Sequence, residues 1–195
     1  MSLVAGSWLP SRIDLEMWDE YAGLHDDAFE LVEGVPTMSP PGEGPVNRGA
    51  GMMLALAINR DRGEWLAVEE LDVTLWEVPR PTVRRPDVVV APAAALRRGA
   101  QPPQIRRVRA DQALFIAEVV SESSVERDHV AKRRDYALAG IASYLVVDLR
   151  SDPGELWLYE ERDADGLFVE VAPRERVVLA VAGVTIPLSL DDLEP

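Results

Sequence analysis

Lys132 is the only lysine among the 20 basic residues of the chain. Lysine carries a compact ammonium on a flexible stem, which suits sites that the broad, planar fork of arginine does not. Two carboxylates, Asp87 and Glu118, lie upstream within apolar runs. An Asp, a Glu and a Lys around a divalent cation fit phosphodiester hydrolysis, because the cation activates a water molecule that the ammonium can orient. A bias toward arginine codons, with one lysine left by chance, explains the same count.

The spacing allows Lys132 to meet Glu118. Glu118 is three residues before the predicted end of its strand at Ser121, roughly 10 Å back along the strand. Lys132 is nine residues after the predicted helix cap, Ser123, roughly 13 Å along the helix. Because a crossover helix runs antiparallel to the strand that it follows, both side chains reach about the same height. Asp128, one turn before Lys132, is equally suited to an ordinary surface ion pair.

The two carboxylates need compensation if they are buried, because an unpaired buried charge is strongly destabilising. If the strands of Asp87 and Glu118 are neighbours, a divalent cation between them offsets both charges. Two alternatives stay open: the acids face solvent, or they are buried and paired with Arg84 or Arg85.

Periodicity predicts a mixture of helices and strands. Helices are expected at 13–24, 46–60 and 126–139, and strands at 29–40, 83–91, 113–121, 142–148 and within 155–190. Residues 65–76 are expected to form either one long strand or a hairpin with a bend at Glu69-Glu70. The strand–helix–strand unit over 113–148 needs a right-handed crossover and therefore a parallel strand pair. The prediction is an α+β (mixed α/β) fold, with a mixed β-sheet flanked by helices. A length of 195 residues fits one domain.

Composition narrows the class of protein. Hydrophobic residues make up 47% and charged residues 28%, which is typical of a globular chain. With no cysteine and two histidines, disulfides, thiolate zinc sites and a three-histidine zinc site are excluded. No signal peptide is recognised, and the longest uncharged stretch is too short to span a bilayer. A soluble, cytoplasmic protein without membrane partners is expected.

The ordered series of motifs resembles the Uma-type restriction endonuclease family, a branch of the PD-(D/E)XK nuclease superfamily. The resemblance rests on Arg-Pro-Asp87-Val-Val-Val, Glu118-Val-Val-Ser-Glu-Ser-Ser, Lys132, Tyr136-Ala-Leu-Ala-Gly and the hairpin Phe29-Glu30-Leu-Val-Glu-Gly34. It covers nearly the whole chain. It implies one restriction-endonuclease-like domain over 1–195, with a helix and hairpin at 13–40, a core at 46–150 and C-terminal strands at 155–190.

The resemblance also implies roles for individual residues. Asp87 and Glu118 would bind Mg²⁺ or Mn²⁺, with a backbone carbonyl near Val119 as a third ligand, and Lys132 would position the attacking water. Val120 occupies the usual lysine position of the superfamily. The resemblance therefore implies that the lysine is displaced to the following helix, where Lys132 stands.

Other positions take part less directly. Glu30 matches the glutamate of the family's hairpin and is expected to support the site near the metal. Ser121 and Tyr136 match the motif, although capping and packing explain them equally well. Asn47 stands where the family commonly has a histidine, which is a departure from the pattern.

The net charge of −14 disfavours binding to nucleic acid, because an acidic chain repels the phosphate backbone. Residues 84–109, however, hold seven arginines against Asp87 alone. Phosphate contacts are therefore predicted for this segment, at Arg84, Arg85, Arg97 and Arg98. The alternative is a solvated loop whose arginines pair with the acidic tail or with a second subunit.

The leading hypothesis is thus a metal-dependent endonuclease that hydrolyses phosphodiester bonds in DNA, with Mg²⁺ or Mn²⁺ as cofactor. An alternative is a non-catalytic binding or assembly module that keeps the nuclease fold and acts through a protein partner or an oligomer. A third possibility, a hydrolase of a smaller phosphate ester, uses the same residues. A homodimer or higher homo-oligomer is expected in either of the first two cases.

Overall fold

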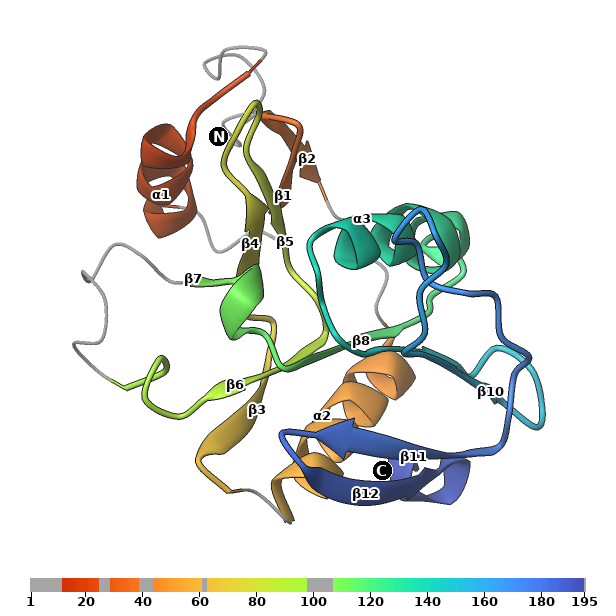
Figure 1. Cartoon of the computed structure of the whole chain (residues 1–195). Helices are drawn as coiled ribbons and strands as arrows, with labels where there is room; N and C mark the ends of the chain where they lie inside the picture. The colour runs from red at the N-terminus through yellow and green to blue at the C-terminus, as the bar shows by residue number, and fades with distance from the viewer. Residues whose placement is uncertain (1–11, 25–28, 39–43, 61–62, 98–106, 195) are drawn as a thin grey trace.

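The computed structural model describes residues 12–24, 29–38, 44–60, 63–97 and 107–194. Their strands form two five-stranded sheets and a two-stranded sheet (Figure 1). The first sheet has the order β2-β1-β5-β4-β7, and its strands are Val35–Met38, Phe29–Val32, Thr82–Arg84, Asp72–Trp76 and Arg107–Arg109. The second has the order β10-β9-β8-β6-β3, with Glu155–Tyr159, Tyr144–Asp148, Phe115–Val119, Val88–Pro92 and Trp65–Glu69. The third pairs β11, Arg176–Val181, with β12, Val184–Ser189.

The strand–helix–strand unit has the predicted parallel geometry. β8 and β9 are parallel, with Glu118 opposite Val146. The helix between them contains a π-helical segment, Arg127–Lys132, and continues as α3, Arg133–Leu138. β6 and β3 extend the same sheet in antiparallel orientation, so the sheet is mixed as expected.

Alternation along the central strands gives the second sheet two apolar faces. Residues such as Ala117 and Val119 pack toward α2, Pro45–Arg60, on one side. Ile116 and Val120 pack toward α3 on the other side. Figure 1 shows β8 between α2 and α3. Since side chains alternate along a strand, Glu118 lies on the α3 face with Ile116 and Val120.

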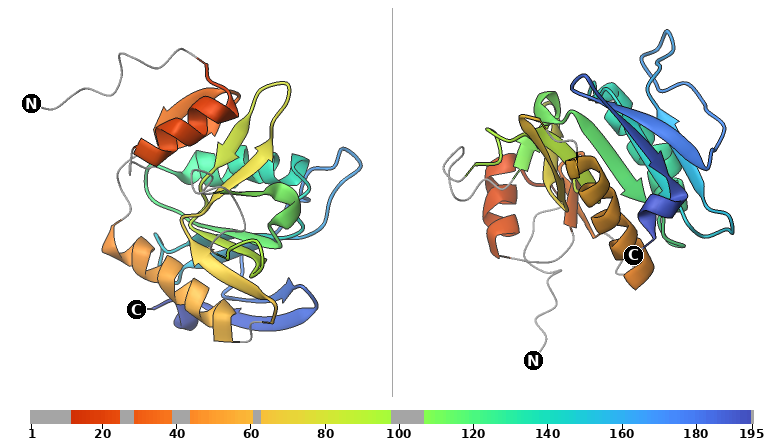
Figure 2. Two further views of the ribbon diagram at one scale, coloured as in Figure 1. Left: turned by 90° about the vertical axis from the view of Figure 1, so that its left-hand side faces the viewer. Right: turned by 90° about the horizontal axis from the view of Figure 1, so that it is seen from below.

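The first sheet carries the N-terminal helix. α1, Leu15–Leu24, packs with the β1–β2 hairpin and β5 through a small core that includes Trp18, Leu31 and Val83 (Figure 2). The predicted helix and hairpin of the N-terminal region are therefore present.

Two of the places where the chain passes between the two large sheets are adjacent. One is between β3 and β4, at Glu70, which has a φ of 52°. The other is at Arg85-Pro86-Asp87, between β5 and β6. The two places are joined, because the Glu70 N–H donates to the Asp87 carbonyl at 3.2 Å. The prediction of one continuous strand over 83–91 is wrong: it is two strands in two sheets, and Asp87 lies in the connection.

Candidate active site

The structure brings Glu118 and Lys132 into direct contact. Lys132 Nζ lies 2.7 Å from Glu118 Oε1, and both side chains are buried. The helix returns along β8 as the spacing predicted, and its π-helical segment ends at Lys132. Segments of π-helix are uncommon and occur often at functional sites. The alternative of a surface pair between Asp128 and Lys132 is wrong, since both residues are buried.

Three carboxylates surround the Lys132 ammonium. Besides Glu118, the Oε1 atom of Glu30 lies 3.3 Å away and the Oδ1 atom of Asp128 lies 3.6 Å away. Burial alone lowers the pKa of Lys132, but Glu118 and Glu30 outweigh burial and the pKa is raised. Lys132 therefore stays an ammonium at neutral pH.

Glu118 is held by two donors on the same oxygen. The Tyr136 hydroxyl donates to Glu118 Oε1 at 2.7 Å, beside the Lys132 contact. Burial raises the pKa of Glu118 well above its ordinary value; Lys132 opposes the rise, and the charges of Asp87 and Asp128 add to it. Burial is thus the main cause of the rise in the pKa of Glu118, and the neighbouring carboxylates increase it.

Asp87 reaches the same strand from the connection between the sheets. Its Oδ2 atom accepts a hydrogen bond from the Val119 N–H at 2.5 Å. Asp87 is half-buried, whereas Glu118 is fully buried, so Asp87 is the more accessible carboxylate of the pair.

Glu30 extends the site into the first sheet. It is 2% exposed, and its Oε2 atom accepts from Arg84 Nη1 at 2.7 Å. Burial raises the pKa of Glu30, but Lys132 and Arg84 outweigh burial and lower it to about 2. Glu30 therefore contacts the ammonium of the site, as a supporting residue would.

Arg84 and Arg85 are not placed as phosphate contacts. Arg84 is 4% exposed and bridges Glu30 and Asp135, so its predicted contact with nucleic acid is wrong. Arg85 pairs with Asp72 through Nε at 2.6 Å and is only partly exposed. The alternative in which Glu118 pairs with Arg84 or Arg85 is wrong, since Glu118 pairs with Lys132. Ion pairs join the two arginines to Glu30, Asp135 and Asp72.

The remaining predicted residues lie apart or have local roles. Arg97 is exposed, and Arg98 lies outside the described residues. Ser121 follows β8, and its N–H donates to the Ser124 hydroxyl at 2.8 Å, which fits the capping alternative. Asn47, at the start of α2, donates to the Val120 carbonyl at 3.1 Å and so contacts the strand end beside the site.

Sequence reasoning missed Asp135. Its position three residues after Lys132 indicated the same helix face, but its partner, Arg84, is 51 residues away in the chain. No local pattern joins residues at that separation.

The donor set fits a divalent cation of the magnesium type. Within the described residues no group of three or more His, Cys, Asp or Glu side chains forms a metal site. Mg²⁺, however, is commonly held by one or two carboxylates, with water and substrate phosphate completing its coordination. Asp87 and Glu118 supply two carboxylates of this kind, and an added cation would offset the negative charges beside the buried Glu118. The Val119 carbonyl is the third ligand that the sequence resemblance implies.

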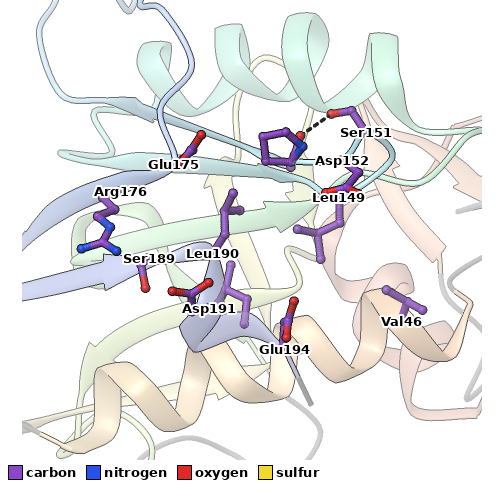
Figure 3. A pocket seen from close by; sticks show the side chains of 13 residues that line it. Val46, Leu149, Ser151, Asp152, Glu175, Arg176, Ser189, Leu190, Asp191 and Glu194 are labelled. Atoms are coloured by element: carbon purple, nitrogen blue, oxygen red, sulfur yellow. Dashed lines mark hydrogen bonds between the residues drawn. The ribbon is translucent and has the colours of Figure 1, made fainter.

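A separate pocket of about 420 Å³ lies nearby on the α2 side, between the loop after β9 and the C-terminal strands (Figure 3). Val46, Leu149, Asp152, Arg176 and Asp191 are among its lining residues. Neither Asp87, Glu118 nor Lys132 lines it.

The mixed sheet with its parallel β8–β9 pair, its flanking helices and the Glu118–Lys132 pair at its centre defines a nuclease-like α+β fold. A solved structure of 17% identity shares this fold: a nuclease, described as putative and assigned to DUF820, from Anabaena variabilis ATCC 29413. The TM-score is 0.65, and the similarity covers 90% of this chain and 95% of that one.

The chain belongs to the Uma2 family, described as "Putative restriction endonuclease", whose sequence pattern matches residues 18–190. The resemblance seen in the sequence motifs is thereby confirmed. No curated protein matches the chain significantly. Among the described residues, no helix is long and apolar enough to cross a membrane.

Proposed function

We propose that the protein is a metal-dependent endonuclease that hydrolyses phosphodiester bonds in DNA. The observation that carries the proposal is the buried Lys132–Glu118 contact of 2.7 Å beside Asp87, at the end of a parallel strand. Family membership supports nuclease chemistry, and the choice of DNA is our inference from the endonuclease description of the family.

The cation would be Mg²⁺ or Mn²⁺, bound by Asp87, Glu118 and the Val119 carbonyl. When bound, it would lower the pKa of a water molecule and withdraw charge from the phosphate. The contribution of the protein is to hold these ligands. Lys132 and Tyr136 both occupy Glu118 Oε1, which fixes the carboxylate and leaves its Oε2 atom for the cation.

Lys132 orients the attacking water. Its Nζ atom forms ion pairs with Glu118 and Glu30, at 2.7 and 3.3 Å. The third carboxylate, Asp128, is 3.6 Å away, and its Oδ1 atom accepts no hydrogen bond from the described residues. In the proposed mechanism the Lys132 ammonium donates to the water and balances charge on the phosphate in the transition state.

The substrate must approach an acidic chain. With Arg84 buried, Arg97 and Arg98 are the proposed phosphate contacts, and Arg85 can add one only by sharing its bond to Asp72. Binding through so few cations predicts weak affinity for DNA and a shallow dependence of that affinity on salt.

The test is cleavage of circular, linear and single-stranded DNA with Mg²⁺ or Mn²⁺, in parallel with a small chromogenic phosphodiester. Glu118→Gln and Lys132→Met should lose activity, whereas Asp111→Asn, which removes an exposed acid outside the site, should keep it. Activity that survives both site variants contradicts the proposal. Cleavage of the small ester alone favours the hydrolase of smaller phosphate esters.

A second candidate is a non-catalytic module that keeps the fold and acts through a protein partner or a homo-oligomer. The closed surroundings of Lys132, whose side chain is 4% exposed, favour this candidate. Calorimetric titration distinguishes the two: the module binds no Mg²⁺ or Mn²⁺, and Asp87→Asn leaves its melting temperature unchanged. Light scattering of the same samples measures whether the protein is the homodimer or larger oligomer that we propose.

A further inference from the structure

Arg84 joins two carboxylates that lie on opposite sides of it. Its Nη1 atom donates to Glu30 Oε2 at 2.7 Å. Its Nε and Nη2 atoms donate to Asp135 Oδ2 at 3.1 and 2.5 Å. The side chain is 5% exposed, so these bonds form in a largely water-free environment where charged groups interact strongly.

The Glu30 end of this bridge leads to the reacting centre. Glu30 divides its oxygens between two sides: Oε2 faces Arg84, and Oε1 faces Lys132 at 3.3 Å. Oε1 also accepts the Arg85 N–H at 3.2 Å, in the connection that leads to Asp87. Glu30 therefore fixes the ammonium and the start of the Asp87 connection with one carboxylate.

The Asp135 end leads to the same helix. Asp135 belongs to α3, three residues after Lys132. Arg84 thus holds the Lys132 helix twice, directly through Asp135 and indirectly through Glu30. Glu30, Arg84 and Lys132 come from β1, β5 and the helix before α3, so the bridge joins the first sheet to the helix that covers the second.

We propose that Arg84 is a positioning residue of the candidate active site: through Glu30 and Asp135 it holds the Lys132 ammonium against Glu118. The consequence for catalysis rests on the proposed function. Arg84 does not touch the reacting atoms. Its planar fork donates to the two carboxylates from different nitrogen atoms, whereas a glutamine in its place has a single NH₂ group.

The single lysine of the chain makes the position of its ammonium measurable without any substrate. Protein grown with lysine labelled by ¹³C at Cε gives one lysine signal, from Lys132. The rate at which Lys132 is acetylated, followed by mass spectrometry, reports its exposure in the same samples.

The variants are Arg84→Gln and Asp135→Asn, which keep Lys132 as the single lysine. Asp135→Asn alters only the outer end of the bridge, where the side chain is 16% exposed, and serves if Arg84→Gln does not fold. Arg107→Gln is the matched control, because Arg107 holds Asp19 with two bonds of 2.9 Å in the first sheet and lies outside the site.

We expect both test variants to shift and broaden the Lys132 signal and to raise its acetylation about tenfold, the factor that corresponds to about 1.4 kcal/mol. We also expect kcat for DNA cleavage to fall about tenfold with little change in KM. The control Arg107→Gln should lose thermal stability but keep the wild-type Lys132 signal, acetylation rate and kcat. Folded test variants with the signal and acetylation rate of the wild type would overturn the proposal.

The two proposals fail in different ways. If the wild type does not cleave DNA, the proposed function fails, yet the Lys132 signal still decides whether Arg84 positions the ammonium. If the Lys132 signal moves while kcat stays at the wild-type value, the positioning role in catalysis is refuted and the nuclease assignment stands.

Discussion

Replacement of Glu30 by glutamine tests the buried charge network through stability alone. The pKa of Glu30 is lowered from 4.5 to about 2, because Lys132 and Arg84 outweigh the effect of burial. At 1.36 kcal/mol per pH unit, this difference corresponds to about 3 kcal/mol of stability at neutral pH. A folded-state pKa below the unfolded one means that this stability is complete above pH 4.5 and is lost as the pH falls toward 2.

The free energy of unfolding of Glu30→Gln should therefore be about 3 kcal/mol lower than that of the wild type at pH 7. The difference should narrow between pH 4.5 and pH 3, because only the wild type loses the contribution of Glu30 over that range. Urea unfolding, followed by tryptophan fluorescence at several pH values, measures this difference in unfolding free energy. The contributions of other titrating groups largely cancel, because both proteins contain them. Asp111→Asn, in an exposed ion pair, should change stability little. A difference that stays constant from pH 7 to pH 3 would refute the reasoning.

Three further predictions concern single side chains. Lys132→Arg keeps the charge but cannot place one compact ammonium among three carboxylates, so cleavage should fall about 10²- to 10³-fold in a folded protein; a fully active variant contradicts this. Tyr136→Phe removes the donor to Glu118 and should lower the unfolding free energy by about 1.5–3 kcal/mol in urea, and a neutral effect would show that the bond adds nothing. Gly34→Ala should lower it by about 1–2 kcal/mol, since Gly34 has a φ of 77° and a Cβ would lie 3.3 Å from the Ile13 carbonyl oxygen; an unchanged melting temperature argues against strain there.

The central contact of the site was predictable because it depends on local geometry. One strand and the helix after it have fixed rises per residue, so the meeting of Glu118 and Lys132 follows from their spacing. The π-helical segment was not predicted, because its hydrogen bonds leave no distinct hydrophobic period over six residues.

Contacts between distant segments were not predictable in the same way. The run 83–91 has the apolar pattern of one strand, and alternation does not reveal that its halves belong to different sheets. Counting charges over 84–109 suggested free arginines, but the acids that neutralise Arg84 come from residues 30 and 135. Their approach depends on the tertiary fold, which a local charge count does not contain.

The bridge through Arg84 has a consequence for the order of folding. Its hydrogen bonds join Arg84 to Glu30, 54 residues earlier in the chain, and to Asp135, 51 residues later. Contacts of such sequence separation carry a loop-closure entropy that local helices and hairpins do not. During synthesis, Arg84 is added to the chain 51 residues before Asp135. The ion network is complete only when β1, β5 and the helix of Asp135 have come together, so the site forms after these local elements have met.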